Sequence, residues 1–214
     1  MPGAAAAAKE LAAAGIAALE LVGLGNDSHA DSLRRFHSDR RIADGPPRRL
    51  LAERRDLLND SVRRIPDWLP GMAAAMAAAD EHATWTEYAP SEWAQPFVER
   101  MAAGFLVGPT APVVSYDVSF GMFVVAPNTF YREHGHPARE VYVVVSGRTE
   151  FLSSDGWITL GPGDASVQEP EVTHALRTGS EGMLCFWAWT GDVSSAIWGF
   201  DQEGNRFIPQ RRDQ

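Results

Sequence analysis

The sequence predicts an α+β fold in which helices come first and pack on one side of a small β-barrel or jelly roll. Residues 8–104 are rich in Ala, Leu, Arg and Glu and contain few β-branched runs. From residue 111 onward, short β-branched or aromatic runs alternate with Gly, Pro, Ser and Asp. Eight such runs within roughly 80 residues are typical of a barrel or jelly roll. Because the helix-rich segment precedes the strand-rich segment instead of alternating with it, we expect the helices and the strands to form separate parts of the fold.

The helix-rich half contains residues that typically begin and end helices. We predict helices over residues 11–24, 49–64, 72–84 and 90–104. The second has leucines at helical spacing and ends before Pro66, and the third opens after Pro70 and Gly71. The fourth starts at Pro90 and has Pro96 in its first turns, where proline is better tolerated.

The second half is read as strands separated by turns. The predicted strands cover residues 113–118, 121–125, 141–145, 149–152, 157–160, 165–168, 174–178 and 183–189. We therefore divide the chain into a helical region, residues 1–104, and a barrel, residues 105–214. The single cysteine, Cys185, excludes an intrachain disulfide and lies in an apolar run, where a buried inert thiol is expected.

Composition excludes several classes of function. A chain of 214 residues with 45% hydrophobic and 22% charged residues is typical of a soluble globular protein. A net charge of −9 argues against a nucleic-acid partner, which would require a basic stripe. No segment has the length and apolarity of a membrane span, and no secretory signal is evident. We therefore expect a cytoplasmic protein without a membrane partner.

The most informative feature is a cluster of metal-ligand residues in the strand-rich half. His134, His136 and Glu140 follow the pattern His-x-His-x3-Glu, with Gly147 further on, and His174 lies 34 residues after Glu140. Residues two apart on a strand point to the same face, so both histidines of the pair can face a barrel interior. Imidazoles and a carboxylate suit zinc, iron(II), manganese or nickel without choosing among them.

This block, with its later histidine, resembles the two motifs of the cupin superfamily. Within that superfamily the chain is most similar to the bacterial dimethylsulfoniopropionate (DMSP) lyases that have an N-terminal helical region. The details that match are Tyr131, Tyr142, the run that begins at His174, and the sequence Trp189-Thr190-Gly191-Asp192. The specific similarity covers approximately residues 120–192, and the helical region matches only in kind.

The chain also departs from the general cupin pattern. Asn128 stands where the first motif usually opens with glycine, and Glu169 and Glu171 stand where the second usually has proline and glycine. These departures concern the shape of loops and not the ligand residues.

The resemblance implies a double-stranded β-barrel that holds one divalent metal ion per chain. Residue by residue, it implies His134, His136, Glu140 and His174 as the metal ligands. Tyr131 and Tyr142 match tyrosines that act as the base or lie against the metal, and Trp189 matches a pocket aromatic. Cupins often pair through their sheets, so a homodimer is a possible assembly.

The chemistry of DMSP cleavage agrees with these groups. The substrate is a cationic sulfonium carboxylate, and its β-elimination gives acrylate, dimethyl sulfide and a proton. A divalent ion on the carboxylate would stabilise the transition state, and a tyrosine near a cation is a strong base. The sulfonium needs an aromatic wall, for which Trp187 and Trp189, two apart on the last predicted strand, are candidates.

Two other functions stay open at this stage. The first is a cupin dioxygenase or isomerase that acts on another small carboxylic acid, because one ligand set serves many reactions. The second is a non-catalytic cupin that binds or senses a small molecule. A cupin regulator would usually carry a DNA-binding module, and the N-terminal half shows no basic recognition helix.

Overall fold

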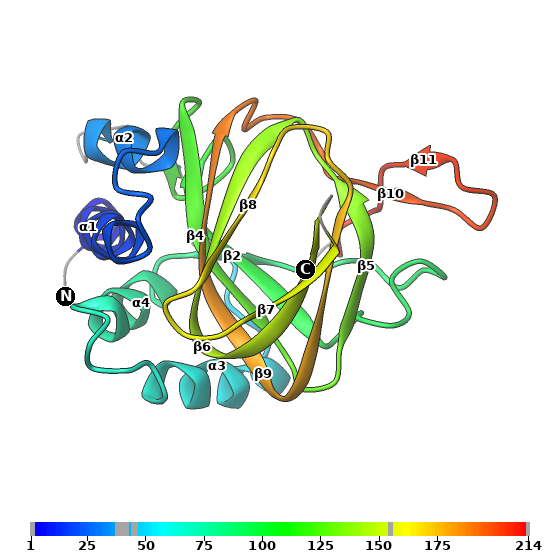
Figure 1. Ribbon diagram of the computed structural model, residues 1–214, viewed down its shortest axis with the longest axis horizontal. Coiled ribbons are helices and arrows are strands. Elements are labelled where there is room, and N and C mark those ends of the chain that lie inside the picture. The colour runs from blue at the N-terminus through cyan, green and yellow to red at the C-terminus, as the bar shows by residue number, and fades with distance from the viewer. Residues whose placement is uncertain (1–2, 37–42, 44–46, 154–155, 213–214) are drawn as a thin grey trace.

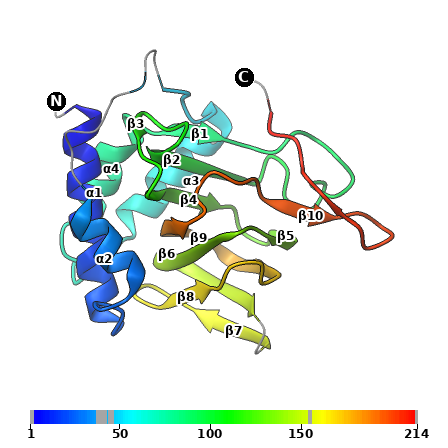
Figure 2. The same ribbon diagram turned by 90° about the horizontal axis from the view of Figure 1, so that it is seen from above.

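Helices cover one side of a curled β-barrel in the computed structural model of the chain (Figure 1). The structure describes residues 3–36, 43, 47–153 and 156–212. In a perpendicular view, α1 (Ala4–Leu21) and α2 (Ser28–Arg35) lie beside the barrel, on the side away from β10 (Trp198–Phe200) (Figure 2). The prediction of an α+β fold with helices against a β-barrel is confirmed.

The helices begin where the sequence supplies breaks and caps. After α1 and α2 come α3 (Ala52–Arg63) and α4 (Met72–Asp80). Three of the predicted helices, over residues 11–24, 49–64 and 72–84, therefore exist. The first starts earlier because its alanines favour helix and ends at Leu21, and the third ends at Asp80 because Thr84 already lies in a strand. Helix α2 was not predicted from the sequence. It is capped by Asp27, whose side chain accepts a hydrogen bond from the backbone N–H of His29 at 2.9 Å.

The strands form one curled, largely antiparallel sheet. They are β1 (Thr84–Thr86), β2 (Met101–Gly108), β3 (Val113–Val114), β4 (Val118–Val125), β5 (Phe130–Gly135), β6 (Ala138–Ser153), β7 (Gly156–Leu160), β8 (Ala165–Gln168), β9 (His174–Gly191), β10 and β11 (Arg206–Phe207). All eight predicted runs fall within or overlap these strands. The two short runs 141–145 and 149–152 are parts of β6, and 174–178 and 183–189 are parts of β9.

The long strands β6 and β9 run through both halves of the barrel. The second half of β9 pairs with β4 and with the start of β6, whereas its first half pairs with β5 and with the end of β6. Both strands bend at glycines with positive φ, Gly147 and Gly182. A Cβ at Gly147 would lie 2.2 Å from the carbonyl oxygen of Gly182, so only glycine fits this close approach. Gly147, which follows Glu140 in the predicted ligand block, thus lies at a bend within a strand and not in a turn between strands.

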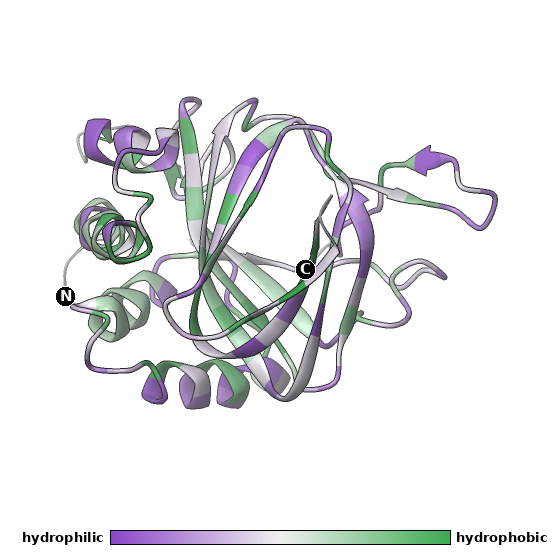
Figure 3. Cartoon of the chain, viewed as in Figure 1, coloured by the Kyte–Doolittle hydropathy of each residue, from purple (hydrophilic) through white to green (hydrophobic). Residues whose placement is uncertain are grey.

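The alternation of side chains along β9 separates two cores. Met183, Cys185 and Trp187 point into the barrel, where they pack with the tyrosines of β5 and β6. Leu184 and Phe186 point outward and pack under the helices. Figure 3 shows hydrophobic residues along β4 and α4, where the helices meet the sheet. The predicted buried Cys185 is confirmed, and burial raises the pKa of its thiol well above the usual range.

The helix predicted over residues 90–104 is wrong. The residues before Met101 form a succession of turns, and β2 begins at Met101. β2 lies between β1 and β4 and hydrogen-bonds with both. Gly104 lies against the Trp85 ring, so close that a Cβ there would be 3.0 Å from it. Pairing on two sides thus outweighs the helix preference of Ala and Met in this segment.

The first half of the chain contributes strands as well as helices to the fold. Both β1 and the first half of β2 precede residue 105 and pair within the barrel sheet, so strand pairing continues across the predicted domain boundary. The division at residue 104 stays a prediction. Within the described residues, no helix combines the length and apolarity that crossing a membrane requires.

The contact between α1 and the barrel depends on Gly15. A Cβ at this position would lie 2.6 Å from the edge of the Phe186 ring, which is fully buried. We predict that Gly15→Leu lowers the free energy of unfolding by about 1–3 kcal/mol through overpacking. Chemical denaturation followed by circular dichroism measures the change. Ala6→Leu, at an exposed position of the same helix, is the control; equal midpoints for the two variants would contradict the packing account.

Candidate active site

Three predicted ligand residues converge inside the barrel. The donor atoms of His136, Glu140 and His174 all lie within 4.8 Å of one another, and the three side chains are buried. The Nε2 atoms of His136 and His174 are 3.0 and 3.6 Å from Oε2 of Glu140. His136 follows β5, Glu140 lies near the start of β6, and His174 opens β9. We call these three residues the ligand group.

Backbone carbonyls fix the orientation of each imidazole. The Nδ1–H of His136 donates to the Ala138 carbonyl at 2.9 Å, and that of His174 donates to the Val172 carbonyl at 2.9 Å. In the neutral ring this leaves the Nε2 lone pair directed at the Glu140 carboxylate. A histidine that ligates a metal is commonly held in this way, with its other ring nitrogen bound to a carbonyl or carboxylate.

The ligand group is short of a positive charge. With its Nδ1–H committed to a carbonyl, a neutral His136 ring would present a lone pair to a carboxylate oxygen, and Nε2 of His174 is buried with no hydrogen-bond partner among the residues that the structure describes. Burial disfavours the charged form of Glu140, but the charge and hydrogen bonds that His136 and His174 supply when protonated outweigh it and hold the pKa of this carboxyl well below its usual range. A divalent cation would satisfy all three donors, so the residues fit a zinc, iron(II), manganese or nickel ion.

His134 lies beside the ligand group but is not one of its three converging donors. It pairs with His174 across β5 and β9, and the two ring centroids are 4.2 Å apart. Its Nδ1–H donates to the Arg132 carbonyl at 2.8 Å, as in the other two histidines. Burial, followed by the neighbouring His174, lowers the pKa of His134 well below the usual range, so its ring is neutral. Its role as a fourth ligand stays a prediction.

Trp189 contacts two members of the ligand group. Its indole N–H donates to Oε1 of Glu140 at 2.5 Å, and its ring lies 4.5 Å from that of His136. The indole therefore orients the carboxylate while its ring remains part of a cavity wall. The N–H of Trp187 donates instead to the Met122 carbonyl, and its ring lies 5.7 Å from that of Trp189.

A small chamber of about 30 Å³ opens beside the ligand group. This inner chamber is lined by Met101, Ala103, Phe105, Phe123, Tyr131, Glu140, Tyr142, Trp187, Trp189, Ile197 and Arg211. The structure thus brings both predicted tyrosines, both predicted tryptophans and one predicted ligand to the same space. It is apolar apart from its hydroxyls and two opposite charges, Glu140 and Arg211.

The two chamber tyrosines have different surroundings. The hydroxyl of Tyr131 shares a 2.6 Å hydrogen bond with that of Tyr88, and its ring stacks on His134 at 3.9 Å. Tyr142 lies between Phe123 and Phe151. Burial, reinforced by the charge of Glu140, raises the pKa of Tyr142 well above its usual range, and burial, reinforced by Tyr88, does the same for Tyr131. A phenolate at either position therefore needs a nearby positive charge.

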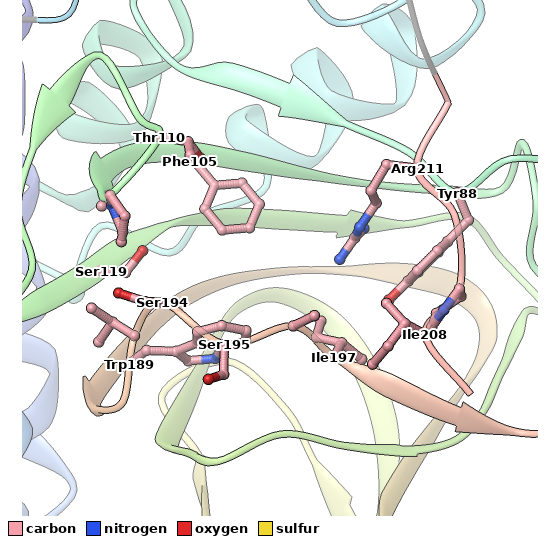
Figure 4. Close-up of a pocket in the computed structure, with 15 residues that line it drawn as sticks. Tyr88, Phe105, Thr110, Ser119, Trp189, Ser194, Ser195, Ile197, Ile208 and Arg211 are labelled. Atoms are coloured by element: carbon pink, nitrogen blue, oxygen red, sulfur yellow. The ribbon is translucent and has the colours of Figure 1, made fainter. Parts of the chain in front are cut away.

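A larger mouth cavity of about 260 Å³ adjoins the inner chamber (Figure 4). It shares Phe105, Trp189, Ile197 and Arg211 with that chamber. Tyr88 and Arg211 were not predicted as site residues from the sequence. Tyr88 lies between the helices predicted over residues 72–84 and 90–104, and Arg211 lies near the C-terminal end. The two lie together because residues 88 and 211 form a β-bridge, and no local pattern signals a pairing over that separation.

The helical region reaches the strand that carries Glu140. Arg139 donates from one guanidinium nitrogen to both carboxylate oxygens of Asp27, at 2.8 and 3.0 Å, and its carbonyl is 3.0 Å from Nε2 of His29. Burial opposes ionisation of Asp27, yet Arg139 and His29 lower the pKa of its carboxyl to about 2. The N-terminus of α2 therefore fixes the residue that precedes Glu140.

Comparison with known proteins agrees with this site. The sequence profile of the dimethylsulfoniopropionate lyase family matches residues 34–185. The chain is 29% identical over 153 residues to the dimethylsulfoniopropionate lyase DddQ of Ruegeria pomeroyi, with 71% of this chain and 73% of the relative covered.

Solved structures share the fold. One chain from the crystal structures of the DMSP lyases RdDddP and RnDddQII superimposes with a TM-score of 0.68 at 23% identity, covering 91% of this chain and 98% of that chain. The crystal structure of the DMSP lyase DddQ from Ruegeria pomeroyi DSS-3 gives a TM-score of 0.60 at 22% identity, covering 85% and 94%. The family match extends over more than half of the sequence and includes the whole ligand group. The chain therefore belongs to the DMSP lyase family.

Proposed function

We propose that this chain cleaves DMSP by β-elimination, using a divalent metal ion and a tyrosine general base. The proposal rests on the ligand group. Two imidazole nitrogens face a buried carboxylate in this group, and the carboxylate lines the same chamber as two tyrosines. Such a donor set is suited to a Lewis-acidic ion, and the chamber supplies a base and an aromatic wall beside it.

The reaction needs one base and no general acid. The base removes the proton α to the carboxylate, that electron pair forms the carbon–carbon double bond, and the bond from the β-carbon to sulfur breaks. Dimethyl sulfide leaves as a neutral molecule, so it needs no proton, and acrylate keeps the carboxylate. A bound divalent ion, held by His136, Glu140 and His174 with His134 as the proposed fourth ligand, would supply stabilisation of the charge that develops on the carboxylate.

Either chamber tyrosine can serve as the base in this proposal. Tyr142 follows Glu140 by two residues on β6, which suits it to ligation or to orienting the carboxylate. Tyr131 lines the same chamber and its hydroxyl is positioned by a hydrogen bond with that of Tyr88, so we assign proton abstraction to Tyr131 first. Trp187 and Trp189 form the wall for the sulfonium, since a cation over an indole face is stabilised by roughly 0.5–2 kcal/mol.

The direct test is incubation of the metal-loaded protein with DMSP. We expect dimethyl sulfide in the headspace and an equal amount of acrylate in solution. Consumption of dioxygen without dimethyl sulfide would mark an oxygenase, and binding without any turnover would mark a sensor; either outcome would overturn the proposed reaction.

We predict that His136→Ala and His174→Ala each remove most of the bound ion and of the activity. Each substitution deletes one of the converging nitrogen donors. Elemental analysis of the purified variants measures the ion, with about one per wild-type chain expected. His82→Ala, outside the ligand group, is the control and should retain full occupancy. Full metal content in both test variants would refute the ligand assignment.

Replacement of each tyrosine by phenylalanine separates the base from an orienting residue. A lost general base typically costs about 10²–10⁴-fold in rate. We predict that Tyr131→Phe loses kcat to this extent with its metal content intact, and that Tyr142→Phe weakens binding as well. Steady-state kinetics and elemental analysis on the same preparations make the comparison. Near-normal kcat in both variants would show that tyrosine is not the base.

A further inference from the structure

The path to the ligand group passes a single arginine. The mouth cavity and the inner chamber share Arg211, together with Phe105, Trp189 and Ile197. Among the described residues that line the mouth cavity, Arg211 is the only charged one. Figure 4 shows its side chain pointing into the cavity. A ligand that moves between the two spaces must therefore pass close to a guanidinium group.

The backbone on either side of Arg211 is fixed. The N–H of Ala89 donates to the carbonyl of Gln210, and the N–H of Arg212 donates to the carbonyl of Glu87, both at 2.9 Å. These bonds flank the bridge between Tyr88 and Arg211. The guanidinium carbon lies 4.0 Å from the centroid of the Tyr88 ring. The ring supports one face of the guanidinium and supplies no acceptor for its N–H groups.

Arg211 lacks a carboxylate partner in the part of the chain that the structure describes. Its neighbour Arg212 differs, since it lies 3.0 Å from Glu99 and 3.6 Å from Glu87. Two other arginines stack on aromatic rings, Arg177 on Trp157 and Arg206 on Trp198, and both also pair with a glutamate. An arginine that is stacked, directed into a cavity and unpaired has the donors that a small carboxylate requires.

We propose that Arg211 binds the carboxylate of small carboxylic acids at the junction of the two cavities. The inference rests on the proposed function, in which both the substrate and the acrylate product carry such a group. The guanidinium fork accepts a carboxylate in two parallel hydrogen bonds. It selects molecules that carry a carboxylate and repels cations that lack one. Because the metal ion is the group proposed to stabilise the charge that develops on the carboxylate, Arg211 contributes mainly to substrate binding and little to the chemical step.

The test compares acrylate with acrylamide, its neutral analogue of similar size. Binding of each to the metal-loaded protein is measured by calorimetry in the wild type and in Arg211→Gln. A hydrogen bond to a charged group gives an expected loss of about 10- to 100-fold in acrylate affinity, with acrylamide affinity unchanged. The KM for DMSP should rise by a similar factor, while kcat stays within about threefold.

Two further variants control for packing. Arg177→Gln removes an arginine that is stacked on Trp157 at 4.4 Å but lies outside both cavities, and it should leave acrylate binding unchanged. Arg211→Lys keeps the charge without the planar fork and should retain more acrylate affinity than Arg211→Gln. Equal losses of acrylate and acrylamide affinity in Arg211→Gln would show that the substitution acts through packing on Tyr88, and would overturn the proposal.

The outcome is independent of turnover. Unchanged acrylate affinity in Arg211→Gln, with the metal retained, would refute the role of Arg211 even if the wild type cleaves DMSP. Conversely, a wild type that binds acrylate through Arg211 but releases no dimethyl sulfide would contradict the proposed reaction and leave the carboxylate site standing.

Discussion

The buried carboxylate of Glu140 is the constraint on which the rest of the site depends. A carboxylate in an apolar interior is costly unless positive charge and hydrogen bonds compensate it. Trp189 supplies one hydrogen bond, while His136 and His174 present ring nitrogens on the other side. With their Nδ1–H groups committed to carbonyls, these rings in their neutral form add lone pairs and not charge. A cation held among the three donors would resolve the imbalance.

The fold brings these donors together through its two long strands. Glu140 lies near the start of β6 and His174 opens β9, and both strands bend at glycines to serve both halves of the barrel. The outer faces of the same strands pack against α1, α2 and α3, and Arg139 is tied to α2 through Asp27. The helical region therefore fixes the position of the strand that carries Glu140, although it contributes no residue to the ligand group.

The sequence was sufficient to predict the ligand group because its members follow local spacings that strand geometry converts into a shared interior. The helix predicted over residues 90–104 failed because pairing with two neighbouring strands overrides the preferences of Ala and Met. The spacing also did not distinguish His134, which pairs with His174 across β5 and β9, from the three donors that converge. Tyr88 and Arg211 could not be found, because their place depends on a bridge between distant segments.

The measurement that tests the central claim most directly is X-ray absorption spectroscopy of the metal-loaded protein. The account predicts a first shell of imidazole nitrogens and a carboxylate oxygen at about 2.0–2.2 Å from the ion, values expected for zinc with such ligands. Glu140→Gln should lose this shell. An ion surrounded only by water or carboxylate oxygens, or an unchanged spectrum in Glu140→Gln, would contradict the claim that Glu140 and the two histidines hold the metal.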